Sequence, residues 1–438
     1  MPQEPDIEFY IEKEGDVAGR AGDLIRKERL VEGEYAALEG AGATYRVLYQ
    51  STSGTKARFG QPIAVSGLIA FPKRKAPEGG CPVISWAHGT VGSADKCAPS
   101  MDSHVGVEPA DAGLGLLRKI NKAPHKLLNA LLQAGWAVAM TDYEGLGTRG
   151  NHPYLLGESE GRGILDIVPA VRQLAEQTVR QPIADRYAIV GHSQGGQAAL
   201  FAAHLASREK DRYPTQGTLL GVAALAPASN LKGNLLEDPG LQLAYRSPVP
   251  VGDLGGFYAL FSNGVFGGDP DIDANEIFQE AALDKYREDF DTKARAELSQ
   301  DEFWMDRPPL LYGESPQDGI FRAPALQPNT PRAKAWTAYW AQVDAFNPAK
   351  QITVPIRVSQ ARGDERVKPE KTEKLLSQLR DPALNSDPDI ITDLFYGVIA
   401  GVPDPPGLGD HFGLLVDDSE IQTLLEWLAH LPVNRPLA

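Results

Sequence analysis

Cysteine is scarce in this chain, with only Cys81 and Cys97 among 438 residues. Neither stands in a Cys/His spacing typical of a zinc site, so the sequence favours no structural metal of that kind. Cys81 opens an expected strand, and Cys97 lies in the loop beyond the far end of that strand. A strand of about six residues separates the two by roughly 20 Å. A disulfide therefore requires the loop to fold back, and the sequence leaves that pairing open.

Long apolar runs and an excess of basic residues are also missing. No apolar run approaches about 18 residues, so no transmembrane segment is expected. The net charge of −15 argues against nucleic acid or an anionic membrane as a partner. The start, MPQEPDIEFY, has neither the basic nor the apolar part of a signal peptide. We expect either a secreted or periplasmic protein whose signal peptide was removed before residue 1, or a cytoplasmic protein.

What the sequence does contain is an alternation of strand and helix patterns. Apolar, β-branched runs typical of strands occur at 43–51, 62–71, 82–87, 136–143, 186–191, 219–226, 352–360 and 391–398. Helical patterns occur at 125–135, 163–177, 195–207 and 419–431. The alternation predicts an α/β fold, a mainly parallel eight-stranded sheet with helices on both faces. The first two strands are expected to form an antiparallel hairpin at one edge.

The alternation breaks once, after the strand at 219–226. The next strand follows about 110 residues later, and a structureless loop of that length is implausible in a globular domain. The interval is rich in aromatic residues, and helical patterns occur at 274–286 and 331–346. We therefore divide the chain into a first part of the core at 1–229, a helical cap or lid at 230–345, and a second part of the core at 346–438.

Two stretches match G-x-S-x-G, the pattern of the serine hydrolase elbow. Because 44 residues are glycine, chance matches are expected and the context must decide. Ser193 follows the strand at 186–191 and precedes a helix rich in small residues, as the elbow requires. Ser159 follows a loop, and Glu158 and Glu160 would oppose the charge of an alkoxide. We predict Ser193 as the nucleophile, against the alternative of an idle serine in a tight turn, and Ser159 as a residue of a loop or a helix start.

A serine nucleophile needs a general base, and the base needs an orienting carboxylate. In this type of fold the order along the chain is Ser, acid, His. His411 lies in a Gly/Pro-rich loop after the last strand and is the predicted base. His430 is in the last turn of the final helix, where a cation suits the helix dipole. Asp364, just beyond the preceding strand, is the predicted acid, with Asp404 and Asp410 as rivals because they lie near His411.

The oxyanion of the reaction needs two backbone N–H donors. One is expected from Gln194, directly after the nucleophile, at the positive end of its helix. The second is expected from Thr90 in the loop after the third strand, where Gly89 would allow the turn. His88 is then a structural residue. The alternative is a plain tight turn.

An acidic cluster in the cap resembles a calcium loop. Asp269, Asp271, Asp273 and Glu280 match the spacing of its ligands, but Ala274 replaces the glycine that the loop requires. An acidic first turn of a helix explains the same residues. We assign no metal and no cofactor.

Five stretches together resemble the secretory lipase family of α/β-hydrolases, typified by yeast lipase A. They are "ATYRVLYQST", "AHGTVGSADKCAPS", "TDYEGLGT", "GHSQGGQAAL" and "GDERVKP". They span most of the expected sheet domain, whereas the cap matches poorly. The resemblance implies that Ser193, Asp364 and His411 form a triad and that the cap covers an acyl-binding tunnel. Family members can carry disulfides, for which this chain has only Cys81 and Cys97.

The predicted function is that of a serine carboxylic ester hydrolase of the carboxylesterase or triacylglycerol lipase type. It would act through an acyl-enzyme on lipid or small-molecule esters with short to medium acyl chains. Two alternatives stay open. The same triad serves peptidases, thioesterases and acyltransferases, and a hydrolase scaffold can carry a non-catalytic binding protein. The sequence does not determine the acyl-chain length, the alcohol or the oligomeric state.

Overall fold

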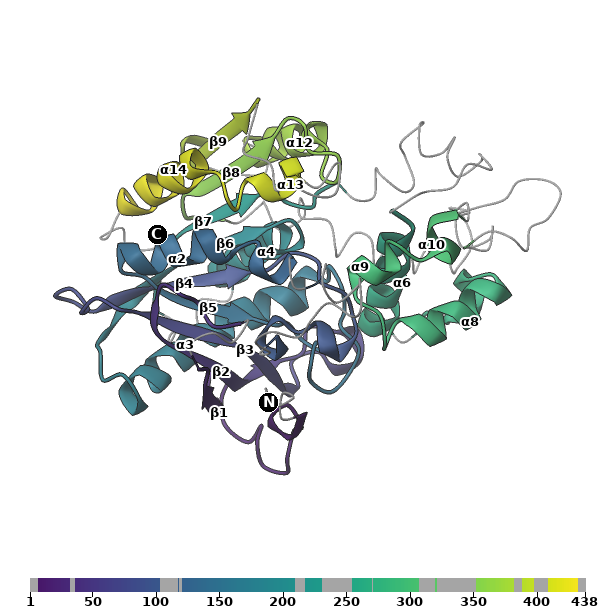
Figure 1. The fold of residues 1–438 in the computed structure, drawn as a ribbon, viewed down its shortest axis with the longest axis horizontal. Coiled ribbons are helices and arrows are strands. Elements are labelled where there is room, and N and C mark those ends of the chain that lie inside the picture. Colours follow the sequence, from purple (N-terminus) through teal and green to yellow (C-terminus); the bar gives the residue numbers. More distant parts are fainter. Residues whose placement is uncertain are drawn as a thin grey trace.

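A twisted sheet crosses the computed structural model, with helices on both of its faces and a further group of helices beside one end (Figure 1). The structure describes residues 7–31, 36–102, 117, 120–208, 217–230, 254–269, 271–306, 320, 352–381, 388–397 and 409–431.

Among these residues the sheet has nine strands, in the order β1-β2-β3-β5-β4-β6-β7-β8-β9. Their bounds are β1 Leu24–Arg29, β2 Ala41–Thr52, β3 Pro62–Pro72, β4 Cys81–Ala87, β5 Ala137–Thr141, β6 Ile183–His192, β7 Thr218–Leu225, β8 Ile356–Ala361 and β9 Ile391–Tyr396. The pairs from β5 to β9 are parallel, and the pairs among β1, β2, β3 and β5 are antiparallel. The predicted α/β class and the hairpin of β2 and β3 are confirmed.

The predicted count of eight strands is wrong by one, because β1 lies outside the hairpin at the edge. Its sequence is LIRKER, and its last three residues are exposed. An edge strand pairs on one side only, and charged side chains there discourage further pairing with other molecules. A search for continuous apolar runs therefore passes over it.

The two faces of the sheet are covered by different helices. The helices of the core are α2 His125–Ala134, α3 Gly157–Gln177, α4 Gln194–Arg208, α12 Pro369–Leu379, α13 Gly409–Gly413 and α14 Asp418–Ala429. Short 3-10 helices lie at Ile7–Phe9, Lys56–Arg58, Asp95–Cys97, Pro99–Met101 and Pro388–Ile390. One apolar core joins the sheet to α3, α4 and α12, and a second joins its other face to α2 and α14. Val83 and Ile84, neighbours on β4, belong to the first and the second core, as the alternation of side chains along a strand requires.

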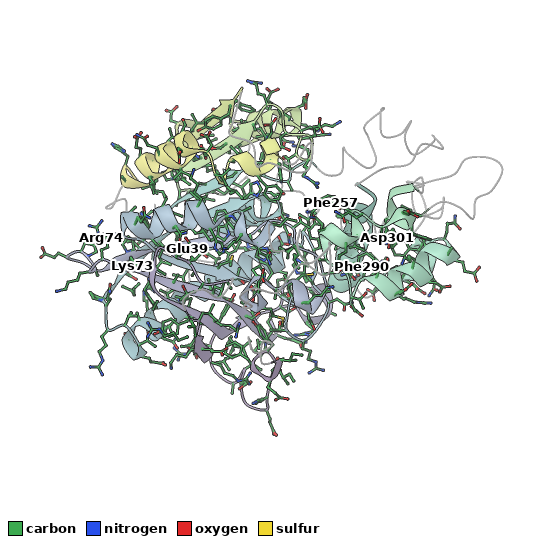
Figure 2. All side chains as sticks on the ribbon, viewed as in Figure 1. Glu39, Lys73, Arg74, Phe257, Phe290 and Asp301 are labelled. Atoms are coloured by element: carbon green, nitrogen blue, oxygen red, sulfur yellow. The ribbon has the colours of Figure 1, made fainter. Side chains whose placement is uncertain are left out.

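The described part of the predicted cap is helical. It consists of α6 Leu254–Gly268, α7 Ala274–Ile277, α8 Glu280–Asp289, α9 Arg295–Leu298 and α10 Glu302–Asp306. Figure 2 labels Phe257, Phe290 and Asp301 in this group of helices. The second boundary of the cap, between 345 and 346, falls outside the described residues, as does the helix predicted at 331–346, and the division into domains stays a prediction.

The cap helices share an apolar cluster with the segment that precedes α3. Phe261, Phe278 and Trp304 are buried in this cluster together with Tyr154 and Leu156. A second attachment is an isolated β-bridge between Gly92 and Ala294. The cap therefore packs against the loops that follow β4 and β5, which lie at the carboxyl ends of these strands.

The helix predicted at 274–286 is divided by Phe278 and Gln279 into α7 and α8. Three of the four residues of the calcium alternative have other partners. The Lys56 ammonium lies 3.0 Å from Asp269 and 2.7 Å from Asp271, and Asp273 caps α7 by accepting the N–H of Asn275.

Both cysteines are buried free thiols, so the pairing left open by the sequence is not formed. The Cys81 thiol donates to the carbonyl of Gly135 at 2.9 Å. Burial raises the pKa of Cys81 to about 11 and that of Cys97 to about 12. In the described part of the chain, no helix combines the length and the apolarity needed to cross a membrane.

Candidate active site

Ser193 occupies a sharp turn between β6, which ends at His192, and α4, which begins at Gln194. Its φ of 59° lies in the left-handed region, which costs a non-glycine residue energy and is common at functional sites. A Cβ on Gly191 would lie 2.0 Å from the oxygen of Gly195, and one on Gly195 would lie 1.9 Å from the oxygen of Ala87. Both glycines are thus required by the close approach of backbone to backbone.

Asp364 and His411 are hydrogen-bonded, with 2.7 Å between Asp364 Oδ2 and His411 Nδ1. Asp364 lies in the loop after β8 and His411 in α13, and both are buried. Oδ1 of Asp364 accepts the N–H groups of Arg366 and Val367 at 2.9 and 3.0 Å. Burial alone would raise the pKa of Asp364, but the charge and hydrogen bond of His411 and these N–H groups outweigh it and lower that pKa. The carboxylate therefore stays ionised beside the imidazole.

The rivals of these two residues are placed differently. The carboxylate of Asp410 lies against Gly363, where a Cβ on that glycine would meet it at 1.9 Å. Asp404 lies outside the described residues. His430 is exposed at the end of α14, with Nδ1 2.7 Å from the carbonyl of Glu426.

His192 links the turn at Ser193 to α13. Its Nε2 lies 2.8 Å from the main-chain oxygen of His411, and the two rings are 4.5 Å apart between centroids. Ser193 is the next residue along the chain. The structure thus brings the neighbourhood of the predicted nucleophile and the predicted base to the same end of the sheet.

The loop after β4 lies over the same turn. A Cβ on Gly89 would lie 3.4 Å from that of Ser193. Gly89 has no positive φ, and this spacing is an ordinary contact, so neither observation requires glycine here, and its part in the turn stays a prediction. Gln194 is the first residue of α4, so its N–H has no partner within the helix. Thr90 is buried, with its hydroxyl 2.8 Å from that of Tyr154.

Ser159 lies in the first turn of α3, consistent with a residue at a helix start. Its hydroxyl donates to Oε2 of Glu144 at 2.5 Å, and Glu144 also accepts the N–H of Gly54 at 3.1 Å. Ser159 thus holds the Glu144 carboxylate, which connects the loop after β5 to Gly54 in the loop after β2.

A buried polar cluster below the loop after β4 was not predicted. Asp142 accepts the N–H of Ser100 at 3.1 Å, the hydroxyl of Ser66 at 2.7 Å and the hydroxyl of Ser100. Its main-chain oxygen lies 3.4 Å from Nε2 of His88. Burial raises the pKa of Asp142 to about 6, although these hydrogen bonds and Arg46 oppose the shift. The cluster joins two stretches on which the family resemblance is based, "TDYEGLGT" with Asp142 and "CAPS" with Ser100. That resemblance is the only sequence signal by which the cluster could have been found.

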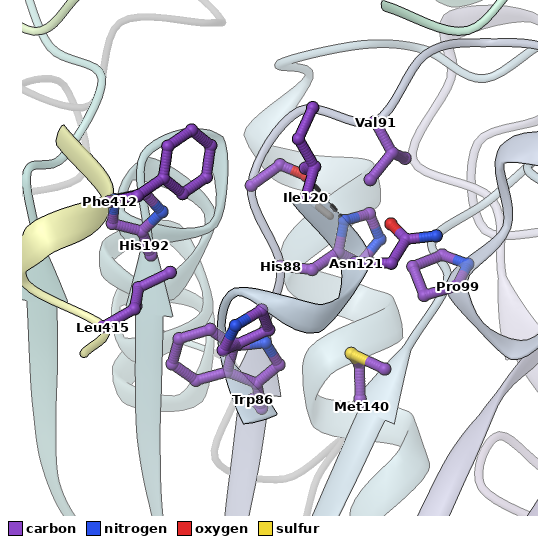
Figure 3. A pocket seen from close by; sticks show the side chains of 12 residues that line it. Trp86, His88, Val91, Pro99, Ile120, Asn121, Met140, His192, Phe412 and Leu415 are labelled. Atoms are coloured by element: carbon purple, nitrogen blue, oxygen red, sulfur yellow. Dashed lines mark hydrogen bonds between the residues drawn. The ribbon is translucent and has the colours of Figure 1, made fainter. Parts of the chain in front are cut away.

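Figure 3 shows a small cavity beside the turn of Ser193, lined by His88, His192, Trp86, Ile120 and Phe412 among others. Its volume is about 20 Å³, room for roughly one water molecule. Burial lowers the pKa of His88 to about 4, and burial with the charge of His411 lowers that of His192 to about 3. Both rings are therefore neutral at physiological pH.

The family model described as secretory lipase matches residues 120–296, a range that contains Ser193 but neither Asp364 nor His411. A protein of Mycobacterium tuberculosis named as a probable inactive lipase is 26% identical over 176 residues. The match covers 40% of this chain and 36% of that protein, so it spans about a third of the relative's length.

Two solved structures cover most of the chain. The rice cell wall degrading esterase LipA of Xanthomonas oryzae, in a ligand-bound form, has a TM-score of 0.66 and 17% identity, covering 94% of this chain and 100% of that one. Lipase A of Candida antarctica, in its closed state, has a TM-score of 0.64 and 16% identity, covering 91% and 82%. The protein therefore has the α/β-hydrolase fold, and the predicted resemblance to the secretory lipase family is confirmed.

Proposed function

We propose that the protein is a serine carboxylic ester hydrolase that acts on lipid or small-molecule esters of short to medium acyl chains. The observation that carries the proposal is the hydrogen bond between Asp364 and His411, held beside the turn of Ser193 through His192. The family match supports an ester as the substrate. A nucleophile, a base and an orienting carboxylate on a hydrolase fold form the minimal set for acyl transfer.

In the proposed mechanism His411 takes the proton of Ser193, whose oxygen attacks the ester carbonyl. The N–H groups of Thr90 and Gln194 stabilise the oxyanion. Because Gln194 is the first residue of α4, the positive end of the helix dipole also points toward this negative charge. Asp364 accepts the Nδ1–H of His411, which fixes the tautomer and stabilises the imidazolium. His411 then returns the proton to the leaving alcohol, and water cleaves the acyl-enzyme by the same steps. This chemistry requires no cofactor.

We also propose that residues 230–345 act as a lid over an acyl-binding tunnel and that the protein is exported. The lid proposal is supported by the packing of the cap helices against the loops after β4 and β5. The export proposal is supported by the match to the secretory lipase family.

The test is hydrolysis of p-nitrophenyl acetate, butyrate and longer esters by the wild type and by Ser193→Ala. The variant should lose several orders of magnitude in kcat, because a triad acts as a unit. Retained activity would refute the assignment of Ser193. Amide and thioester substrates, tested in parallel, separate an esterase from a peptidase or a thioesterase, and added alcohol acceptors reveal an acyltransferase.

A second candidate function is favoured by the relative named as inactive. A hydrolase scaffold that serves only for binding would fail to react with a fluorophosphonate probe. Here a carboxylate and an imidazole are paired next to the serine turn, so we expect the probe to label the wild type and not Ser193→Ala.

A further inference from the structure

The segment between β5 and α3 contacts both residues whose N–H groups are the proposed oxyanion donors. Tyr154 lies in this segment, and its hydroxyl is 2.8 Å from Oγ1 of Thr90. Both side chains are buried, at 5% and 8% exposure. This contact fixes the side chain of Thr90, and with it the start of the loop that follows β4.

The side chain of Gln194 is fixed by two acceptors. Its Nε2 lies 2.6 Å from Oε1 of Glu160 and 3.1 Å from Nε2 of His152. Nδ1 of His152 lies 3.0 Å from the carbonyl of Glu144. Because a carbonyl only accepts, that nitrogen carries the hydrogen, and Nε2 of His152 is free to accept from Gln194. Both N–H groups of the amide are therefore used, and a flipped amide would turn its oxygen toward two acceptors.

Glu160 belongs to the second G-x-S-x-G match, the one that contains Ser159. Its side chain is fully buried. Oε1 accepts the N–H of Leu155 at 2.9 Å as well as the amide of Gln194. Oε2 has no hydrogen-bond partner among the described residues. Burying a carboxyl group with one unsatisfied oxygen costs free energy of folding. The other oxygen of Glu160 binds Gln194, the residue that follows the proposed nucleophile.

We propose that Tyr154 and Glu160 are positioning residues that hold the oxyanion donors in place, Tyr154 through Thr90 and Glu160 through Gln194. Neither residue touches the substrate. Tyr154 lies just before α3 and Glu160 in the first turn of α3, so the donors from the loop after β4 and from α4 are held from one continuous stretch of chain and keep a fixed separation while negative charge develops. Such preorganisation stabilises the transition state more than the bound substrate. The inference rests on the proposed ester hydrolase function.

The experiment compares Tyr154→Phe, Glu160→Leu and Glu160→Gln with the wild type. Tyr187→Phe is the matched control, since it also removes a hydroxyl from a buried tyrosine, on β6 but away from the turn of Ser193. The measurements are kcat and KM for p-nitrophenyl butyrate, and the inhibition constant of an aliphatic trifluoromethyl ketone, whose adduct on serine carries an oxyanion.

Tyr154→Phe and Glu160→Leu should each lower kcat about tenfold, less than the loss of a whole donor, while KM stays within about twofold. Their affinity for the ketone should fall by the same factor as kcat/KM. Glu160→Gln should keep most of the activity, because its amide oxygen can accept the same two N–H groups. Tyr187→Phe should match the wild type.

Wild-type kcat in both Tyr154→Phe and Glu160→Leu would overturn the inference, as would a fall in kcat without weaker ketone binding. A Glu160→Gln variant as impaired as Glu160→Leu would overturn the role of Glu160. If Glu160→Leu does not fold, Tyr154→Phe and Glu160→Gln still decide. A wild type that neither cleaves esters nor reacts with a fluorophosphonate refutes the proposed function itself, whereas an active wild type with unimpaired variants refutes only this inference.

Discussion

The ring of His192 donates its Nε2–H to the main-chain carbonyl of His411 across 2.8 Å. The carbonyl can only accept, so the bond fixes the tautomer of His192. Burial, followed by the charge of His411, lowers the pKa of His192 to about 3 and keeps the ring neutral. The residue that precedes Ser193 thus holds the backbone of the proposed base, which makes it more than a spacer in the G-x-S-x-G pattern.

His192→Ala should therefore lower kcat by about tenfold to a hundredfold, since a small displacement of a reacting group is costly. KM should change much less. His204→Ala removes a histidine from α4 and is the control, with activity expected near that of the wild type. Steady-state kinetics on p-nitrophenyl butyrate would contradict the idea if His192→Ala and His204→Ala behaved alike at equal thermal midpoints.

Two carboxylates near His411 can be separated by experiment. Asp364 accepts from Nδ1 of His411, whereas the carboxylate of Asp410 faces Gly363. Asp364→Asn should lower kcat about 10⁴-fold, because it removes the acceptor that fixes the tautomer. Asp410→Asn should cost less than about tenfold. The measurement is kcat/KM under identical conditions, and a larger loss in Asp410→Asn would reverse the assignment of the acid.

The parts of the fold that sequence predicts are those with a local signature. Each buried parallel strand appears as a short apolar run, and α2, α4 and α14 keep helical spacing of their leucines or small residues. β1 was not predicted, because an edge strand with the sequence LIRKER contains no continuous apolar run. The break between α7 and α8 at Phe278 was not predicted either. The Phe278 side chain is buried in the apolar cluster of the cap helices, and this tertiary contact overrides a continuous helical pattern.

The candidate site divides in the same way. The G-x-S-x-G turn, a loop histidine and an aspartate after a strand are local patterns, and these singled out Ser193, His411 and Asp364. The roles of these residues stay predictions. Tyr154, Glu160 and Asp142 could not be found that way, because each acts through a partner that is distant in the sequence. The sequence shows Glu160 only as a negative charge next to Ser159, the serine of the second G-x-S-x-G match. Its contact with Gln194 depends on how α3 packs against α4.

The glycines of the turn provide a test of its geometry. A Cβ on Gly191 or Gly195 would meet backbone oxygen at 2.0 or 1.9 Å, so the backbone must move to accept it. We expect Gly191→Ala and Gly195→Ala to lower stability by about 1–3 kcal/mol or more and to abolish most activity. Gly397→Ala is the control, since none of the residues that the structure describes lies within 4 Å of a Cβ there. Urea unfolding and ester hydrolysis measure both effects, and normal activity in Gly195→Ala would contradict the tight turn.

Glu160 predicts a specific dependence of stability on pH. Burial raises its pKa from 4.5 to about 8, and the hydrogen bonds from Gln194 and Leu155 offset this only in part. The folded protein keeps the proton that the unfolded chain releases, so this stabilisation is complete below pH 4.5 and is lost as pH rises toward about 8.

Glu160→Gln has no such proton to lose. Its thermal midpoint relative to that of the wild type should therefore rise by several degrees between about pH 5 and about pH 8. The buried histidines His88, His152 and His192 titrate in the opposite sense but are present in both proteins, so they cancel in the difference. A difference that is constant across this range would show that Glu160 is already ionised in the folded state.

The last prediction concerns the buried ion pair of Arg357 and Glu420, which ties β8 to α14. Their side chains are fully buried, and the guanidinium reaches both carboxylate oxygens at 2.6 and 2.7 Å. Arg357→Met leaves a buried charge without its partner and should cost about 3–5 kcal/mol, whereas Arg357→Met combined with Glu420→Leu should recover most of that loss.

The control is the pair of Arg362 and Glu373, which lies 3.3 Å apart on the surface with both side chains more than half exposed. Arg362→Met should change stability by less than about 1 kcal/mol. Because β8 leads directly to Asp364 and α14 follows the helix of His411, the single variant should also lose activity at temperatures where it remains folded. Urea unfolding with parallel assays decides the matter, since equal destabilisation by Arg357→Met and Arg362→Met would mean that the buried pair does not hold these two elements together.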